Sequence, residues 1–476
     1  MEGKKNYPVI AVLGLFSLLT SLAGSSTNLA LPKIAVSLGV SSGMATWVVQ
    51  SGLITTAILL VMFGHLGDLI SKNYIFLHGG IAFLIGSTIT GFAVNFWMMI
   101  LGRIVQAVGS AMIMANSMGI VNDYFPDKRR AEALSYISMF ISVGAISGPA
   151  FGGFIMSVAT WRWIFWINIP ISILALVLGF KILPSPKQTV GSIKKVVHGA
   201  NWTGQSLFTV GMVIFFLSGS FFQGGKNIPL GFGFLVVGTI ITVYSFIQDD
   251  KSKTPWIAPE LLRNRAYMTS ISALLLVMVV NAVSNILLPF YLQSYGLLTP
   301  LESGLITMLQ SVTMLITSPF AGILADRMNR ELLTVFGLAV LTFSQIGYIL
   351  YPATMNLPLI ILPIVLNGIG MALFLSPNNA LTMGLVDKSL SGIAGSFNSF
   401  ARTLGMTIGI SFSSSLLFVQ LPGVVHITPQ LGGEFMTAFR NVFWLAIVIS
   451  GISLLMVIHR YFKSKKATKA SSIGAK

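Results

Sequence analysis

The chain has 476 residues, of which 54% are hydrophobic and only 9% are charged, and its mean hydropathy is +0.84. This composition excludes a soluble protein and predicts an all-α polytopic membrane protein. The formal net charge of +16 is explained by loop topology rather than by nucleic-acid binding, and the lack of cysteine excludes disulfides and zinc–thiolate sites.

Fourteen apolar segments, each about 20 residues or longer, follow one another along the chain. The first begins after Lys4 and Lys5 and is too long for the core of a signal peptide, so we expect it to stay as a spanning helix. The predicted helices cover residues 8–31, 45–67, 75–93, 96–121, 132–158, 163–182, 203–222, 229–248, 267–294, 301–324, 332–351, 357–380, 391–418 and 436–459.

The lysines and arginines are distributed unequally between the two sides of this map. Of the 29, 23 fall on one side, three on the other and three within helices. An excess of positive charge marks cytoplasmic loops, so both termini are predicted to be cytoplasmic. We expect a multi-pass protein of the plasma membrane, in a bacterium.

Two polar stretches divide the map into parts. Residues 183–202 and 249–266 are predicted cytoplasmic linkers, the second with a short surface helix, and they flank two helices at 203–248. Six helices remain on each side, at 1–182 and 267–459, each forming a six-helix bundle. Residues 460–476 are a basic cytoplasmic tail suited to the anionic leaflet.

Short motifs recur at corresponding places in the two predicted six-helix bundles. The Gly-x-Leu-x-Asp pattern of residues 64–68 returns at 322–326, and the Gly-x-x-x-Gly pattern of 144–148 returns at 405–409. Such repeats are typical of transporters built from two similar halves around a site near the membrane midplane.

Residues 144–170 read GAISGPAFGGFIMSVATWRWIFWINIP and place small residues along a helix, where a neighbour can approach closely. The residues concerned are Gly144, Gly148, Pro149, Gly152 and Gly153. A single Gly-x-x-x-Gly would be ordinary helix packing. This longer match resembles the antiporter motif on the fifth helix of the major facilitator superfamily, in its fourteen-helix drug–proton antiporter branch. The resemblance implies the major facilitator fold, with two six-helix halves plus two extra central helices.

The stretch GHLGDLISK at residues 64–72 resembles the cytoplasmic motif of the same superfamily, and residues 322–330 resemble its second copy. The resemblance implies a cytoplasmic gate, which the position of Asp68 favours over a simple turn residue. The match is imperfect, because Leu69 replaces the usual arginine and Ser71 the second glycine. The predicted gate residues are Gly64, Asp68, Lys72, Gly322, Asp326, Arg327 and Arg330.

Arg103 and Gln106 lie one turn apart on the fourth predicted helix. An arginine in an apolar span costs about 3 kcal/mol or more, so it must face protein or water. It either contacts substrate or is held by backbone and Gln106. In the family, helices corresponding to 1, 4, 9 and 12 line the cavity. The candidate cavity residues are Asn28, Arg103, Gln106, Asn116, Asn281, Asn285 and Asn378, each of which could instead bond a neighbouring helix.

A proton-coupled cation pump needs a carboxylate inside the membrane. All 13 acidic residues map to loops or helix ends, and Ala23 stands where the family's first helix carries an aspartate. The candidate coupling residues are therefore Glu302, at the outer end of the tenth helix, and Asp123, at the inner end of the fourth. Both could instead be interfacial caps.

The leading hypothesis is a multidrug efflux antiporter, an alternating-access exporter of hydrophobic or amphipathic compounds. Its rival is a lipid or anionic-metabolite transporter without proton antiport, favoured by Arg103 and by the missing carboxylate. A membrane-embedded enzyme would need a convergent catalytic set, and a sensor would need a soluble output domain; neither is found. We predict no metal, cofactor or nucleic acid. The expected partners are an amphipathic small molecule and the bilayer, with protons as the candidate coupling ion, and the expected state is a monomer.

Overall fold

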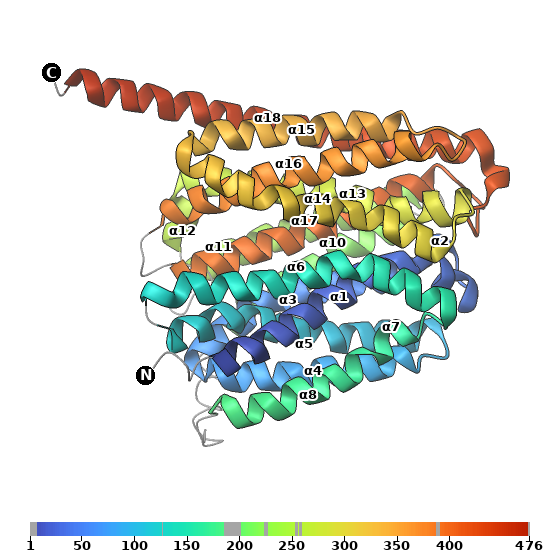
Figure 1. The fold of residues 1–476 in the computed structure, drawn as a ribbon, viewed down its shortest axis with the longest axis horizontal. Coiled ribbons are helices and arrows are strands. Elements are labelled where there is room, and N and C mark those ends of the chain that lie inside the picture. The colour runs from blue at the N-terminus through green and yellow to red at the C-terminus, as the bar shows by residue number, and fades with distance from the viewer. Residues whose placement is uncertain are drawn as a thin grey trace. The chain divides into compact units, whose positions relative to one another are not determined.

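The computed structural model describes residues 7–125, 127–184, 201–222, 227–252, 256, 259–386 and 391–474. All regular elements in these residues are helices, and fourteen of the helices are long and apolar enough to span a membrane (Figure 1). The predicted helix number is therefore confirmed. Helices suit a bilayer because each backbone N–H and C=O group is paired within its own segment.

Eight helices form the first part of the chain. They are α1 (Tyr7–Ser37), α2 (Ser42–Ala45), α3 (Trp47–Leu69), α4 (Lys72–Gly91), α5 (Phe96–Tyr124), α6 (Asp127–Val158), α7 (Trp163–Trp166) and α8 (Asn168–Ile182). The short helices α2 and α7 lead directly into α3 and α8, so each pair makes one span.

The remaining elements follow in the same way. They are α10 (Trp202–Phe222), α11 (Ile228–Asp250), α12 (Pro259–Arg263), α13 (Arg265–Pro289), the π-helix η2 (Phe290–Tyr295), α14 (Pro300–Arg327), α15 (Arg330–Ile349), α16 (Leu357–Gly384), α17 (Ser391–Val419), the 3-10 helix η4 (Pro429–Leu431) and α18 (Gly432–Gly474). Helix α12 is the short helix expected in the second linker. Helix α18 continues without a break into the predicted tail.

The ends of several helices are fixed by their own sequence. The side chain of Asn95 accepts a hydrogen bond from the Met98 N–H at the start of α5, and Asn329 does the same for Glu331 and Leu332 at the start of α15. Prolines also lie inside helices, for example Pro149 in α6, which is tolerated in membrane helices because neighbouring groups pair the freed carbonyl.

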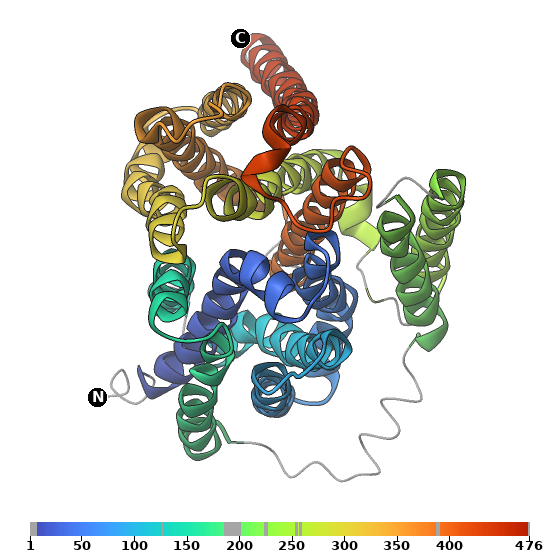
Figure 2. The same cartoon turned by 90° about the vertical axis from the view of Figure 1, so that its right-hand side faces the viewer.

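The chain separates into two compact units. The first contains residues 1–258, 286–308 and 410–431. In it, α4 packs on α5, α1 on α6, and α10 on α11. Figure 2 looks along the helices and shows α10 and α11 as a close pair. The core of this unit is apolar and aromatic, with Phe16 and Phe76 in edge-to-face contact at 5.5 Å between ring centroids.

The second unit contains residues 259–285, 309–409 and 432–476. Here α15 packs on α16 and α18. Stacked aromatic rings join these helices, with Tyr348 lying 4.7 Å from Phe443 and Tyr351 lying 5.9 Å from Phe439, between centroids. The predicted division into two six-helix bundles, linkers and tail stays a prediction, and most of the linker at 183–202 lies outside the described residues.

Candidate functional site

The first copy of the cytoplasmic motif joins three helices at one end of the first unit. Lys72 Nζ lies 3.4 Å from Asp68 Oδ1 and 3.1 Å from both carboxylate oxygens of Asp123. Its side chain crosses Gly119, where an added Cβ would lie 2.7 Å from Lys72 Cδ. The structure therefore brings Asp123, at the end of α5, to the motif. Both carboxylates are exposed, so the ion pairs themselves contribute little stability.

Asn116 joins α5 to α3 close to this motif. Its amide nitrogen donates to the Phe63 carbonyl at 3.2 Å and to the Met112 carbonyl at 2.9 Å. Its side chain occupies the space where Gly67 has no Cβ. Asn116 was a candidate cavity residue, and its donor groups are used in packing α5 on α3.

The second copy of the motif is more open. Arg327 is exposed, Gly322 has free space where a Cβ would be, and Arg330 Nε donates to the Ala325 carbonyl at 3.3 Å. The side chain of Asp326 lies outside the described part of the structure, so the second gate stays a prediction.

The glycines of the helix-5 motif face two different neighbours. Three of them face α1: an added Cβ would lie 2.6 Å from the Leu18 carbonyl oxygen at Gly144, would overlap the Ser25 side chain at Gly148, and would lie 3.2 Å from Ser26 Cβ at Gly152. Serines of α1 bond the same backbone, because Ser26 Oγ donates to the Gly148 carbonyl at 3.0 Å. These contacts fix α6 on α1.

The other two small residues of the motif face α14. A Cβ added at Gly153 would lie 2.5 Å from the Pro300 carbonyl oxygen, and one added at Gly304 would overlap the Pro149 carbonyl. The backbones of α6 and α14 therefore touch at two points, which are four residues apart on each helix. Any side chain larger than hydrogen at Gly153 or Gly304 would separate α6 from the first turns of α14.

Arg103 is buried among helices of the first unit. Its Nε donates to the Val48 carbonyl of α3 at 2.9 Å and its Nη1 to Gln106 Oε1, while Gln106 Nε2 donates to Ser87 Oγ of α4 at 2.8 Å. The guanidinium carbon lies 5.9 Å from the centre of the Phe165 ring. The pairing of Arg103 with Gln106 agrees with the sequence spacing, and Val48 and Ser87 are partners that the spacing did not show.

Three buried amide oxygens in the first unit have no hydrogen-bond partner among the described residues. They are Asn28 Oδ1 on α1, Asn168 Oδ1 on α8 and Gln293 Oε1 in the π-helix η2. Gln293 Nε2 donates to the carbonyl of Leu29, the residue after Asn28, at 2.9 Å. Gln293 therefore bonds the backbone of α1 next to Asn28, where α1 contacts a π-helix, an element often found at functional sites. Asn28 Oδ1 and Gln293 Oε1 leave acceptors for a ligand that donates hydrogen bonds.

A second amide cluster lies in the other unit. Gln310 Nε2 donates to Asn281 Oδ1 at 2.5 Å and to Asn367 Oδ1 at 2.9 Å, and the fully buried Asn367 Nδ2 has no partner among the described residues. Asn285 donates to the Asn281 carbonyl within its own helix at 2.9 Å. Gln310 was not a candidate from the sequence, although it is a lone amide in the apolar segment 301–324.

A buried ionic network in the second unit was missed altogether. Arg460 Nη1 donates to Ser270 Oγ at 2.6 Å, its Nη2 donates to Thr334 Oγ1 at 3.2 Å, and its Nε lies 3.9 Å from Glu331 Oε1. Asn378, a predicted cavity residue, donates to the Ser270 carbonyl at 3.3 Å and accepts from Arg460 at 3.5 Å. The basic composition of the tail concealed Arg460, because it follows directly after the last predicted span.

Glu302 caps the helix in which it lies. The Thr299 N–H and Thr299 Oγ1 both donate to Glu302 Oε2 at 2.8 Å, and the Glu302 N–H donates back to Thr299 Oγ1 at 3.3 Å. This reciprocal pair is a capping box at the start of α14, on an exposed side chain. The role of Glu302 in proton coupling stays a prediction. The described residues contain no group of three or more His, Cys, Asp or Glu side chains that could hold a metal ion.

Comparisons with known proteins agree with this geometry. A sequence model of the Major Facilitator Superfamily matches residues 13–410 and 270–476. The chain is 28% identical over 464 residues to the riboflavin transporter RibZ of Clostridioides difficile (strain 630), covering 98% of this chain and 99% of that protein. It is also 28% identical over 433 residues to the multidrug transporter protein MdtP of Bacillus subtilis (strain 168), covering 87% of this chain and 76% of that protein. Among solved structures, the peptide transporter POT in complex with sulfate has the same fold, with a TM-score of 0.69 and 17% identity over 95% of this chain and 94% of that chain.

Proposed function

The chain belongs to the Major Facilitator Superfamily and is a multi-pass membrane transporter, and we propose that it exports hydrophobic or amphipathic compounds by alternating access, coupled to proton antiport. It acts as a monomer in the plasma membrane. Similarity to MdtP, which is named as a multidrug transporter, supports export of more than one compound.

The contact between α6 and α14 is the observation that best supports transport by alternating access. Gly153 meets the Pro300 carbonyl and Gly304 meets the Pro149 carbonyl, so the two helices close against each other without side chains between them. A glycine-to-backbone contact can form and separate with little rearrangement of side chains, as an outer gate requires. Lys72, Asp68 and Asp123 form the corresponding exposed cluster at the cytoplasmic end.

A neutral polar solute is the second candidate substrate. It is favoured by similarity to RibZ, a riboflavin transporter matched along nearly its whole length, and by the unpaired amide oxygens of Asn28 and Gln293 in the first unit. Polar groups of a ligand bind such amides specifically, because an unpaired buried amide is costly. The anionic rival has less support, since the guanidinium of Arg103 already bonds Val48 and Gln106.

Purified protein in liposomes with an internal pH-sensitive dye tests the function. A lipophilic drug-like dye and riboflavin are added separately, and substrate flux and proton flux are recorded together. The proposal expects the amphipathic dye to drive proton movement. Riboflavin flux without dye flux would favour the second candidate, and dye flux with no proton movement would overturn antiport.

Two variants locate the coupling residue. Glu302→Gln removes the carboxylate at the start of α14, and Glu434→Gln is its matched control, because Glu434 is an exposed acid in the first turn of α18. Loss of proton flux in Glu302→Gln alone assigns coupling to Glu302. Unchanged flux in both variants transfers the assignment to Asp123, which Asp123→Asn then tests.

A further inference from the structure

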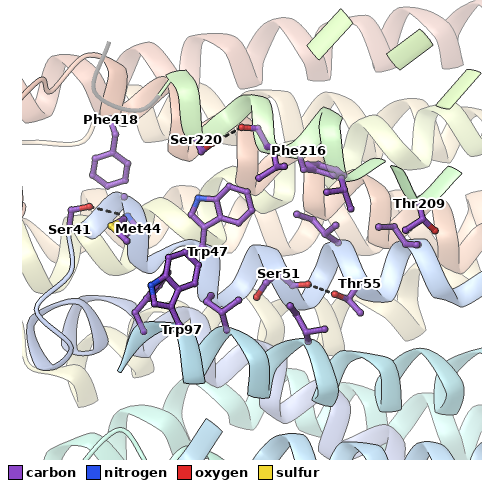
Figure 3. A pocket seen from close by; sticks show the side chains of 18 of the residues that line it. Ser41, Met44, Trp47, Ser51, Thr55, Trp97, Thr209, Phe216, Ser220 and Phe418 are labelled. Atoms are coloured by element: carbon purple, nitrogen blue, oxygen red, sulfur yellow. Dashed lines mark hydrogen bonds between the residues drawn. The ribbon is translucent and has the colours of Figure 1, made fainter. Parts of the chain in front are cut away.

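An apolar cavity of about 820 Å³ lies within the first unit, between α3, α5, α10 and the outer end of α17 (Figure 3). Its walls include Trp47, Ile54, Trp97, Val213, Phe216 and Phe418. The volume is that of a site for a drug-sized molecule. None of the candidate residues of the transport site lines it.

Hydrogen bonds join α10 to α3 and to α17 near the two ends of α10, and the cavity lies between them. Towards one end, Gln205 Nε2 donates to the Ile58 carbonyl of α3 at 3.1 Å. Towards the other, Ser415 Oγ of α17 donates to the Gly219 carbonyl at 3.2 Å, where glycine allows the approach. These two bonds are about 21 Å apart along the helix. Between them, α10 stands away from α3 and α5, and the cavity fills the gap.

A further cluster strengthens the attachment of the α10–α11 pair at its cytoplasmic end. The Trp256 N–H donates to both carboxylate oxygens of Asp249 at 3.0 Å, and its indole N–H donates to the Asn201 carbonyl at 2.8 Å. The Trp256 ring lies 5.0 Å from the ring of His65 on α3. The gap is therefore fixed in place rather than a loose separation of the pair.

Most hydroxyl groups of the wall are used in bonds within their own helices. Thr55 Oγ1 donates to the Ser51 carbonyl at 2.8 Å, Thr209 Oγ1 to the Gln205 carbonyl at 2.8 Å, and Ser220 Oγ to the Leu217 carbonyl at 2.7 Å. Only the Ser51 hydroxyl is buried without a partner among the described residues. A buried water needs two to four polar partners, so this wall does not hold water, and hydrocarbon is the filling that it favours.

The dimensions and position of the cavity match one leaflet of a bilayer. Its wall runs from Thr209 to Ser220 on α10, which is about 16 Å, and half of a hydrocarbon core is about 15 Å thick. With cytoplasmic termini, Trp47 and Trp97 lie at the outer end of their helices. Tryptophan is enriched at that depth because its ring is amphipathic. The cavity therefore extends from the outer interface to about the membrane centre.

We propose that this cavity, the α3–α10 groove, binds one acyl chain of an outer-leaflet phospholipid. The chain fills the gap between α10 and α3 and supports the α10–α11 pair against the rest of the unit. The lining residues carry no charged side chain, so the groove selects hydrocarbon and not a particular head group. An amphipathic substrate would find only the Ser51 hydroxyl and the indole N–H groups of Trp47 and Trp97 to orient its polar end.

A photoactivatable phospholipid tests the proposal. The full-length protein is reconstituted in vesicles of phosphatidylethanolamine and phosphatidylglycerol that contain a phospholipid with a diazirine-labelled acyl chain, and crosslinked residues are mapped by mass spectrometry. Val213→Trp fills the groove. Val237→Trp is the matched control, because Val237 lies on α11, outside the groove, and is 48% exposed against 40% for Val213.

The expected result is crosslinking on the α3 and α10 residues of the groove in the unmodified protein. It should fall at least tenfold in Val213→Trp and stay unchanged in Val237→Trp, with both variants monodisperse and equally stable to heat. Equal labelling in Val213→Trp, or an equal fall in both variants, would overturn the proposal. Displacement of the lipid by a hundredfold excess of a transported dye would also overturn it, and would assign the groove to substrate.

Discussion

Two arginines, Arg103 and Arg460, are buried, and their N–H donors are bonded by different kinds of partner. An arginine cannot lose its charge in a protein, so burial requires that its donors be bonded. Arg103 is bonded by a carbonyl and an amide, both neutral, whereas Arg460 lies beside the carboxylate of Glu331 and two hydroxyls. The first arrangement leaves a net positive charge in the unit, and the second nearly cancels it.

Glu331→Ala is expected to destabilise the protein by about 3 kcal/mol, because it leaves the Arg460 guanidinium buried without its counter-charge. The Glu331 side chain is only 15% exposed, so water compensates little. Thermal unfolding in detergent measures the loss. Glu434→Ala removes an exposed carboxylate and serves as the control. A Glu331→Ala protein as stable as the control would show that Ser270, Thr334 and Asn378 satisfy Arg460 without the carboxylate.

Arg103→Lys tests whether Arg103 holds helices together or contacts substrate. Lysine cannot reproduce the fork that bonds Val48 and Gln106 together, so a loss of about 1.5–3 kcal/mol in stability is expected. Transport should then fall through less folded protein, with KM unchanged for each substrate. A raised KM with normal thermal stability would instead make Arg103 a substrate contact.

Sequence spacing predicted only those residue contacts that lie within one helix. Arg103 and Gln106 are three residues apart, so the helix itself brings them together. Glu331 and Arg460 belong to different helices, α15 and α18, and no local pattern relates them. The acidic residue was placed at a helix end correctly, but its burial depends on how α18 packs.

At the scale of elements, the helix-5 motif shows what a stripe of glycines can and cannot predict. The motif was recognised from its spacing, and close packing against α1 follows that expectation. Successive residues on a helix point about 100° apart, so Gly152 and Gly153 cannot face the same neighbour. The sequence could not show that Gly153 and Pro149 contact α14, because that depends on the partner's own Gly304.

Gly153→Ala is expected to weaken the contact between α6 and α14, because its Cβ would lie 2.5 Å from the Pro300 carbonyl oxygen. The chain lacks cysteine, so Asn28→Cys can report opening to the outside. Labelling of this cysteine by a membrane-impermeant maleimide should become severalfold faster. Gly233→Ala, on α11 with free space around the added Cβ, is the matched control. An unchanged labelling rate in Gly153→Ala would contradict the outer-gate role.

For the whole molecule, the membrane makes the helix count predictable. A bilayer allows only spans with internally paired backbones, so each apolar run of about 20 residues becomes one helix. The arrangement of polar groups was less predictable. Asn116 and Asn378 lie on predicted cavity helices. The side-chain amide of each donates a hydrogen bond to a backbone carbonyl of a neighbouring helix. Side-chain type alone does not distinguish a group that binds a ligand from one that joins two helices.

The charges of the whole chain lead to a prediction about substrate charge. The sequence map places all 13 carboxylates in loops or at helix ends, and the buried Ala23 of the first helix stands where the family carries an aspartate. Arg103 adds positive charge within a span, and a positive charge opposes a cation most strongly where water is excluded. A neutral amphiphile should therefore move at least tenfold faster than a permanently cationic analogue of the same size.

Counterflow in liposomes measures this ratio for a pair of dyes that differ only in a quaternary ammonium group. Arg103→Gln should lower the ratio of neutral to cationic transport rates, because the cation moves faster without the arginine. The comparison is made at the same fraction of folded protein in both samples. Rates are therefore normalised to monodisperse protein. If the cation moves as fast as the neutral dye before any substitution, the field of Arg103 does not reach the translocation path.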